Sequence, residues 1–330
     1  MRWMERTQAP LALVAIACGV LLGAAFPGAR AWEGWLTPAI AALLTATFLG
    51  VPLIELLRGL RDLRFLGTLL GVNFLIVPLV VFGLTRPLAG EDALLFGVLL
   101  VLLTPCVDYV IVFAGLGGGD AARLLAATPL LLLAQFLLLP GYLTLFLGRE
   151  AAGLIDPGPL AWAFVWVILV PLLLAVLVQW GSRRLRLARS FAAAGSAAMV
   201  PLLLLVLGLV FATQTHRIVA EWPAVLGLVP LYAGFFLLML LFAVPVSRIV
   251  GLSAPAARSV ALSGATRNSL VVLPLALAAP PALSLAATAV VTQTLVELIC
   301  LVLATRALPR LFPETAPPRG GGARPDANAG

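Results

Sequence analysis

The sequence predicts an all-α integral membrane protein, with ten transmembrane helices in two inverted five-helix repeats and broken helices 4 and 9 crossing at mid-membrane. Composition is the first observation behind this prediction. The 330 residues are 62% hydrophobic and only 11% charged, and the mean hydropathy is +1.12, far outside the range of soluble domains. The second observation is a succession of apolar segments, and the third is a pair of polar interruptions inside two of them.

Each apolar segment approaches or exceeds the roughly 20 residues that cross about 30 Å of hydrocarbon. The predicted spans are 9–27, 36–57, 65–84, 93–116, 123–147, 160–180, 193–214, 224–248, 257–279 and 283–305. We expect one polytopic transporter domain over 1–312, with repeat one at about 9–147 and repeat two at about 160–305. Residues 313–330 are rich in Pro, Gly and Ala, which predicts a disordered cytoplasmic tail.

The basic residues predict the topology. All 21 are arginines; 16 lie on the N-terminal side of the predicted membrane, 4 on the opposite side and one, Arg267, inside a span. The positive-inside rule therefore places both termini in the cytoplasm and the protein in the cytoplasmic (inner) membrane. The arginine clusters carry no interleaved aromatic residues, so no nucleic-acid partner is expected. No cleavage pattern follows Pro27, which favours a retained first helix over a signal peptide.

Five spans per half force the second half to enter the membrane from the opposite side, as in inverted-repeat transporters. An offset of 162 residues carries Cys106 onto Asn268 and Gln135 onto Glu297. These matches link predicted spans 4 and 9 and predicted spans 5 and 10. Because the matched residues are rare polar ones in an apolar chain, they support the division into repeats.

The two polar interruptions, residues 104–108 and 263–268, are the predicted substrate site. Pro105 removes a backbone donor, and Gly264 with its polar neighbours weakens the second helix in the same way. Freed carbonyls cannot be satisfied by lipid, so such breaks face protein or a watery cavity. The side chains assigned to substrate binding are those of Thr104, Cys106, Asp108, Arg267, Asn268 and Gln135.

The motifs around these breaks resemble those of a known family. Residues 104–113 (TPCVDYVIVF), followed by Leu116 and then 119–120, resemble the fourth-helix signature of arsenite permeases in the bile acid:sodium symporter superfamily. Residues 265–268 resemble that family's broken ninth helix, and residues 294–297 its glutamate-bearing tenth helix. The resemblance implies a panel of spans 1, 2, 6 and 7 and a core of the other six, moving by an elevator-like mechanism. It also implies that Cys106 and Glu297 are needed to extrude trivalent arsenic.

The chemistry of both residues fits that role. Trivalent arsenic is thiophilic, so the Cys106 thiol can recognise it as amides and carboxylates cannot. A single thiol also releases the metalloid more readily than three would. Glu297 stands among apolar neighbours, where burial favours the neutral carboxyl. We therefore predict Glu297 as the proton-coupling residue of an antiporter.

Asp108 and Arg267 leave two alternatives open. The two charges could neutralise each other near the midplane. Alternatively, Arg267 binds an anionic solute, which would make the protein a sodium- or proton-coupled carrier of an organic anion or organoarsenical. Residues 261–263 read Ala-Leu-Ser where sodium-coupled members of the superfamily carry an acidic residue, which favours proton coupling.

Other classes of function find little support. The chain has no lysine, so it has no P-loop for ATP, and its single histidine, His216, cannot build a His-based metal site. No nucleophile and base are paired as in an enzyme. We therefore expect no cofactor, no resident metal and no catalysis, with a small solute, a coupling proton and the lipid bilayer as partners. A homodimer stays open.

Overall fold

The computed structural model describes residues 2–50, 62–107, 109–153, 158, 162 and 165–313. Helices follow one another as α1 (Arg2–Ala25), η1 (Pro27–Trp35), α2 (Leu36–Gly50), α4 (Leu63–Gly71), η2 (Val72–Ile76), α5 (Val77–Leu84), η3 (Arg86–Leu88), α6 (Asp92–Leu102), α7 (Tyr109–Leu116), α8 (Ala121–Gly153), η4 (Val165–Leu169), α10 (Val170–Ser182), α11 (Arg186–Ala220), α12 (Trp222–Val250), α13 (Ala254–Ala265), α14 (Ser269–Leu277), η5 (Pro281–Leu283) and α15 (Leu285–Leu311). The prediction of an all-α fold is confirmed, since the described residues contain no β-strand.

Six helical stretches are long and apolar enough to cross a membrane by themselves, as expected of a multi-pass membrane protein. They are Leu63–Leu84, Ala121–Gly148, Val165–Ser182, Arg186–Ala220, Trp222–Val250 and Pro281–Leu311. Predicted spans 93–116 and 257–279 are absent from this set because each is divided into two short helices. Predicted span 9–27 appears as the shorter apolar stretch Pro10–Ala25.

Several predicted segments include residues outside the described ones, among them residue 108 of span 93–116 and four residues near the start of span 160–180. The predicted span 36–57 is described only up to Gly50, where α2 ends. Within the predicted tail 313–330, only Pro313 is described.

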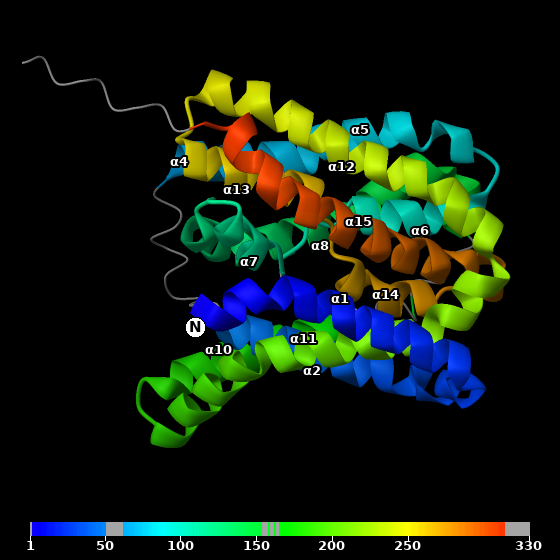
Figure 1. Cartoon of the computed structure of the whole chain (residues 1–330), viewed down its shortest axis with the longest axis horizontal. Coiled ribbons are helices and arrows are strands. Elements are labelled where there is room, and N and C mark those ends of the chain that lie inside the picture. Colours follow the sequence, from blue (N-terminus) through cyan, green and yellow to red (C-terminus); the bar gives the residue numbers. More distant parts are fainter. Residues whose placement is uncertain are drawn as a thin grey trace, which may run out of the picture.

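Helices α1, α2, α10 and α11 form one group, which Figure 1 shows along one side of the molecule. Small residues allow close packing in this group, as is common between membrane helices. A Cβ atom added at Gly19 would lie 2.5 Å from the Gly208 carbonyl oxygen, and one added at Gly23 would lie equally close to the Ala212 carbonyl oxygen. Side chains larger than hydrogen would therefore push α1 away from α11.

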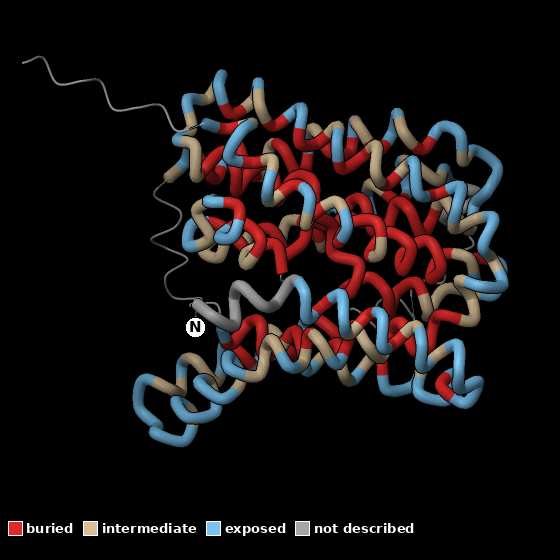
Figure 2. Tube along the Cα trace, viewed as in Figure 1, coloured by how far each residue is buried: buried red, intermediate tan, exposed pale blue. Residues whose placement is uncertain are grey.

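The remaining helices form a second group around α15. Helix α15 packs against α6, α12 and α14, while α7 packs against α8 and α13. Figure 2 shows buried residues concentrated in this second group. In the most apolar part of the span that contains α15, 72% of the residues are buried. The corresponding share for the span that contains α10 is 22%. The polar side chains that face α15 are therefore held in the interior of the molecule.

Candidate functional site

The two interruptions of the helices meet each other in space. Helix α6 ends at Leu102 and α7 begins at Tyr109, while α13 ends at Ala265 and α14 begins at Ser269. Between them, Pro105 and Arg267 form an antiparallel β-bridge. The Cys106 N–H donates to the Thr266 carbonyl at 3.2 Å, and the Asn268 N–H donates to the Thr104 carbonyl at 2.9 Å. The unwound segments thus satisfy part of each other's backbone, as a membrane interior requires.

Residues 104–107 and 266–268 meet at the crossing of the two interruptions, and local side chains complete the helix ends there. The Thr104 hydroxyl lies 2.9 Å from the Leu100 carbonyl and 3.0 Å from the Val101 carbonyl, so it bonds the last turn of α6. The Asn268 side chain caps the start of α14 by accepting from the Val271 N–H at 3.3 Å. Thr104 and Asn268 therefore shape the crossing directly, and their predicted contact with substrate stays a prediction.

Glu297, from the middle of α15, receives three hydrogen bonds at the crossing. Its Oε2 accepts from the Arg267 backbone N–H at 2.7 Å and from the Gln293 side-chain amide. Its Oε1 accepts from the Tyr109 hydroxyl at 2.6 Å. The side chain is 2% exposed. The carboxyl group is thus held against both interruptions, since Tyr109 opens α7 and Arg267 precedes α14.

The Arg267 guanidinium lies in a separate cluster of oxygen atoms. Its Nη2 donates to the Asn73 Oδ1 at 2.8 Å and to the Ser263 and Gly264 carbonyls at 2.6 Å each. Its Nη1 donates to the Leu102 carbonyl at 3.3 Å. Arg267 is fully buried, and the guanidinium carbon lies 5.5 Å from the centre of the Phe235 ring. Both terminal nitrogens are therefore engaged by oxygen atoms of the protein itself.

Asn73, which reaches this cluster, lies in a stretch where the helix is underwound. The π-helix η2 interrupts the regular helix between α4 and α5, and such bulges often accompany functional sites. The Asn73 amide donates to the Leu69 carbonyl and to the Ser263 hydroxyl at 3.0 Å each, while its oxygen accepts from Arg267. Gly264 lets the two elements approach, since an added Cβ would lie 2.7 Å from Val72 Cγ1.

Cys106 is fully buried at the crossing. Its thiol lies close enough to the Arg267 guanidinium for the two groups to interact electrostatically, as do Glu297 and Tyr109. Gln135, in α8, is also fully buried, and within the described part of the chain neither of its amide atoms has a hydrogen-bond partner. Asp108 lies outside the described residues, so its predicted pairing with Arg267 stays a prediction.

Several other buried polar atoms at the crossing lack a hydrogen-bond partner among the residues that the structure describes. They are Arg267 Nε, Asn268 Nδ2, Ser269 Oγ and Gln293 Oε1. Leaving a buried donor or acceptor unpaired costs about 1–3 kcal/mol, so native structures contain few such atoms. Their concentration on consecutive residues of one interruption and on a neighbour of Glu297 is typical of a site for a polar solute.

Three contributors to the site were not predicted from the sequence as functional: Asn73, Tyr109 and Gln293. Each has a feature in the sequence that could have marked it as functional. Asn73 is the one amide within predicted span 65–84, and Gln293 precedes Glu297 by one helical turn. Tyr109 lies within the motif of residues 104–113, directly after Asp108.

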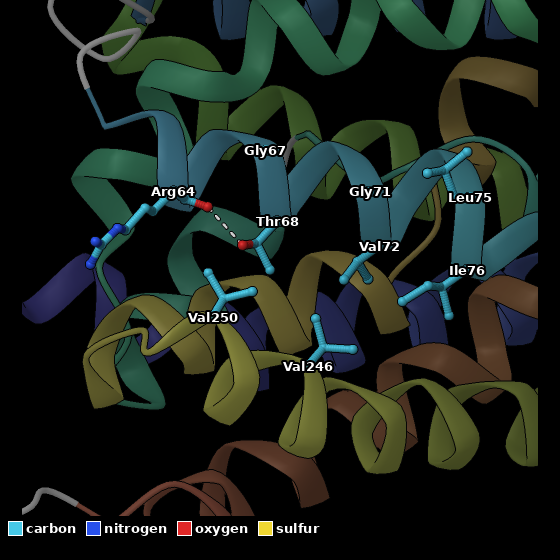
Figure 3. A pocket seen from close by; sticks show the side chains of 9 residues that line it. All are labelled: Arg64, Gly67, Thr68, Gly71, Val72, Leu75, Ile76, Val246 and Val250. Carbon is cyan, nitrogen blue, oxygen red and sulfur yellow. Dashed lines mark hydrogen bonds between the residues drawn. The ribbon is translucent and has the colours of Figure 1, made fainter.

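An open groove lies elsewhere, between α4 with η2 and the C-terminal part of α12. It encloses about 390 Å³ and is lined by Arg64, Gly67, Thr68, Gly71, Val72, Leu75, Ile76, Val246 and Val250 (Figure 3). The Thr68 hydroxyl already donates to the Arg64 carbonyl at 2.7 Å. With an almost wholly apolar lining, this groove offers no chemistry comparable to that of the crossing. The described residues also contain no group of three His, Cys, Asp or Glu side chains able to hold a metal ion.

Comparison with known proteins agrees with the resemblance at the level of the family. No curated protein matches the sequence. The sequence model of the Sodium Bile acid symporter family matches residues 37–221, which is more than half of the chain and includes α6, α7 and their interruption. Together with the apolar helices, this match identifies a multi-pass membrane transporter. The chain belongs to the sodium bile acid symporter family.

Proposed function

We propose that this protein is a secondary active transporter that expels trivalent arsenic, as neutral arsenous acid, in exchange for protons. The observation that carries the proposal is the meeting of a thiol and a carboxyl at one unwound segment. Cys106 bonds to Thr266 through its backbone N–H, and Glu297 bonds to the next residue, Arg267. The two groups that arsenite antiport needs therefore act on the same short stretch of chain.

Two inverted repeats of five helices account for the order of the elements. Shifted by 162 residues, α6 and α7 coincide with α13 and α14 to within two residues, so the interruptions correspond. The same shift takes Gln135 of α8 onto Glu297 of α15. In this arrangement both termini are cytoplasmic and the protein lies in the inner membrane, in agreement with the arginine distribution.

An elevator-like movement suits the two groups of helices. Helices α1, α2, α10 and α11 would form the static panel, and the remaining helices would form the moving core that carries the crossing. Each group packs chiefly within itself, while contacts such as those of α15 with α11 and of α7 with α1 join them. Movement along such a boundary would expose the crossing alternately to the two sides of the membrane.

The Cys106 thiol gives selectivity for arsenic. In the binding step, a sulfur–arsenic bond forms while the thiol proton and one hydroxide of arsenous acid leave together as water. Hydrolysis reverses the step and releases the solute. Sulfur is the soft ligand that trivalent arsenic prefers, and a single bond to the protein keeps release feasible. The unpaired atoms of Asn268 and Ser269 are available to the remaining hydroxyl groups.

Glu297 is the proposed proton carrier, and Tyr109 can serve both of its protonation states. The Tyr109 hydroxyl lies 2.6 Å from Glu297 Oε1 and 3.3 Å from the Arg267 carbonyl oxygen. A hydroxyl has one hydrogen to donate but can also accept. When Glu297 is ionised, Tyr109 donates to it; when Glu297 is protonated, it can donate to Tyr109, which turns its hydrogen to Arg267.

The position of Arg267 supports a neutral solute over an anion. Its Nη1 and Nη2 are already bonded to four oxygen atoms of the protein. Among the guanidinium nitrogens only Nε lacks a partner in the described residues, so a two-pronged grip on a carboxylate or other anion would have to displace some of these bonds. Transport of such an anion is therefore the second candidate, to be adopted if arsenite is not transported.

Resistance to arsenite in a hypersensitive bacterial host tests the proposal. Cells that express the wild-type chain should grow at arsenite concentrations that stop cells carrying the empty vector. Cells expressing Cys106→Ala at equal membrane abundance should not. Failure of the wild type to protect, with normal insertion into the membrane, would contradict arsenite efflux.

A further inference from the structure

The environment of the Arg267 guanidinium has the composition of a cation site. Four oxygen atoms surround it, three from backbone carbonyls and one from the Asn73 amide. None of the four belongs to a carboxylate, and the described residues form no ion pair with Arg267. Among the described residues, the positive charge is therefore bound by neutral oxygen ligands, as hard monovalent cations are in transporters.

The ends of two interrupted helices supply three of these four ligands. Leu102 is the last residue of α6, and Ser263 and Gly264 lie in the last turn of α13. The carbonyls at a helix C-terminus have no partner within the helix and carry its negative partial charge. Two such ends directed at one point attract a cation strongly, and in discontinuous membrane helices they coordinate sodium ions or protons.

We propose that the Arg267 side chain acts as a tethered cation, occupying a site of backbone and amide oxygens that would otherwise hold a free monovalent ion. A guanidinium is always charged and spreads its charge over several donors, which suits it to several carbonyl acceptors at once. Because the cation is part of the chain, the charge of the site does not depend on the sodium concentration. The inference concerns the chain itself and stands whether or not arsenite is the solute.

The tethered cation also positions the carboxyl group of Glu297. The guanidinium holds the ends of α6 and α13, and the backbone N–H of the same residue donates to Glu297. Arg267 is therefore a positioning residue. Loss of its side chain should loosen both helix ends and leave four oxygen atoms without their donor.

Chemical rescue of a truncated variant tests this inference. In the purified full-length protein, Arg267→Ala should lower the Tm in choline chloride, and millimolar sodium chloride or guanidinium chloride at equal ionic strength should raise it by a few degrees. The wild-type Tm should not distinguish among the three salts. Arg258→Ala is the matched control, since Arg258 is a buried arginine that donates to the Gly118 and Phe312 carbonyls away from the crossing.

Recovery of the Tm of Arg267→Ala by either cation, with no effect on Arg258→Ala, supports the proposal. No recovery with either cation, or an equal response of the wild type, overturns it. If Arg267→Ala yields no folded protein, Arg267→Lys and Arg267→Met replace it. Lysine keeps the positive charge and methionine fills the space without it, so equal losses of stability in these two variants would also overturn the proposal. None of these measurements uses a transported solute, so they succeed or fail independently of arsenite efflux.

Discussion

Arg267 forms its hydrogen bond to Glu297 through its backbone N–H and not through its guanidinium. The Arg267 N–H lies 2.7 Å from Glu297 Oε2, whereas the guanidinium donates to carbonyl oxygens and to Asn73. One residue thus joins the proposed proton carrier to the ends of two interrupted helices. A change in the bonding of Glu297 acts directly on the backbone of the interruption that also contacts Cys106.

Loss of the Cys106 thiol should abolish arsenite transport. Alanine cannot form the sulfur–arsenic bond, so we expect the initial rate in everted vesicles to fall at least roughly tenfold, the effect of about 1.4 kcal/mol. Cys18→Ala is the control, because Cys18 is exposed on α1 and away from the crossing. Equal rates for Cys106→Ala and Cys18→Ala would show that no thiol bond takes part.

Glu297→Gln should separate solute exchange from proton-driven transport. The amide oxygen can still accept from the Arg267 N–H, but the side chain can no longer carry a proton. We expect exchange of labelled arsenite across the membrane to continue while uptake driven by a pH gradient falls to background. Uptake that still follows the pH gradient in this variant would remove Glu297 from the coupling mechanism.

Asn73→Leu should destabilise the protein, although Asn73 lies in a different helix from both interruptions. Leucine is similar in size but leaves a guanidinium donor and the Ser263 hydroxyl without their partner. The expected cost is about 1–3 kcal/mol, measured as a lower Tm of the purified protein. Thr45→Val is a suitable comparison, since Thr45 bonds only to the Ala41 carbonyl of its own helix. A smaller loss for Asn73→Leu than for Thr45→Val would argue against the cluster around Arg267.

Gly97→Ala tests the packing that brings α6 onto α15. An added Cβ would lie 2.5 Å from the Ala286 carbonyl oxygen and 2.6 Å from its Cα, so the helices must separate. We expect a loss of about 1–3 kcal/mol, seen as a lower Tm. Gly83→Ala is the control, because nothing lies within 4 Å of its added Cβ. Similar melting temperatures for the two variants would contradict the close approach of α6 and α15.

The sequence was sufficient to predict the all-α class, the two interruptions and the burial of the Glu297 carboxyl. These features depend on signals that a single segment carries, such as Pro105 or a carboxyl among apolar residues. The division of predicted span 257–279 could be located for the same reason, since Gly264 and its polar neighbours interrupt an otherwise apolar run.

The bonding within the site could not be predicted in the same way. Asn73 lies 194 positions before Arg267 in the sequence, and only the folded chain with its π-helix brings them together. The second interruption donates to Glu297 through a backbone N–H, which no residue type reveals. The ion pair of Arg267 with Asp108, predicted from two charged residues at neighbouring breaks, stays a prediction because Asp108 lies outside the described residues. The carbonyls that bind the guanidinium are backbone atoms at helix ends, which residue type does not reveal either.

Arsenite uptake by everted membrane vesicles in sodium-free buffer tests the central claim most directly. With a pH gradient imposed, acid inside, wild-type vesicles should accumulate arsenite in exchange for internal protons, and collapse of the gradient with a protonophore should stop accumulation. Cys106→Ala and Glu297→Gln vesicles should stay at background. Accumulation that requires sodium, or that is absent in the wild type under an intact gradient, would contradict arsenite/proton antiport.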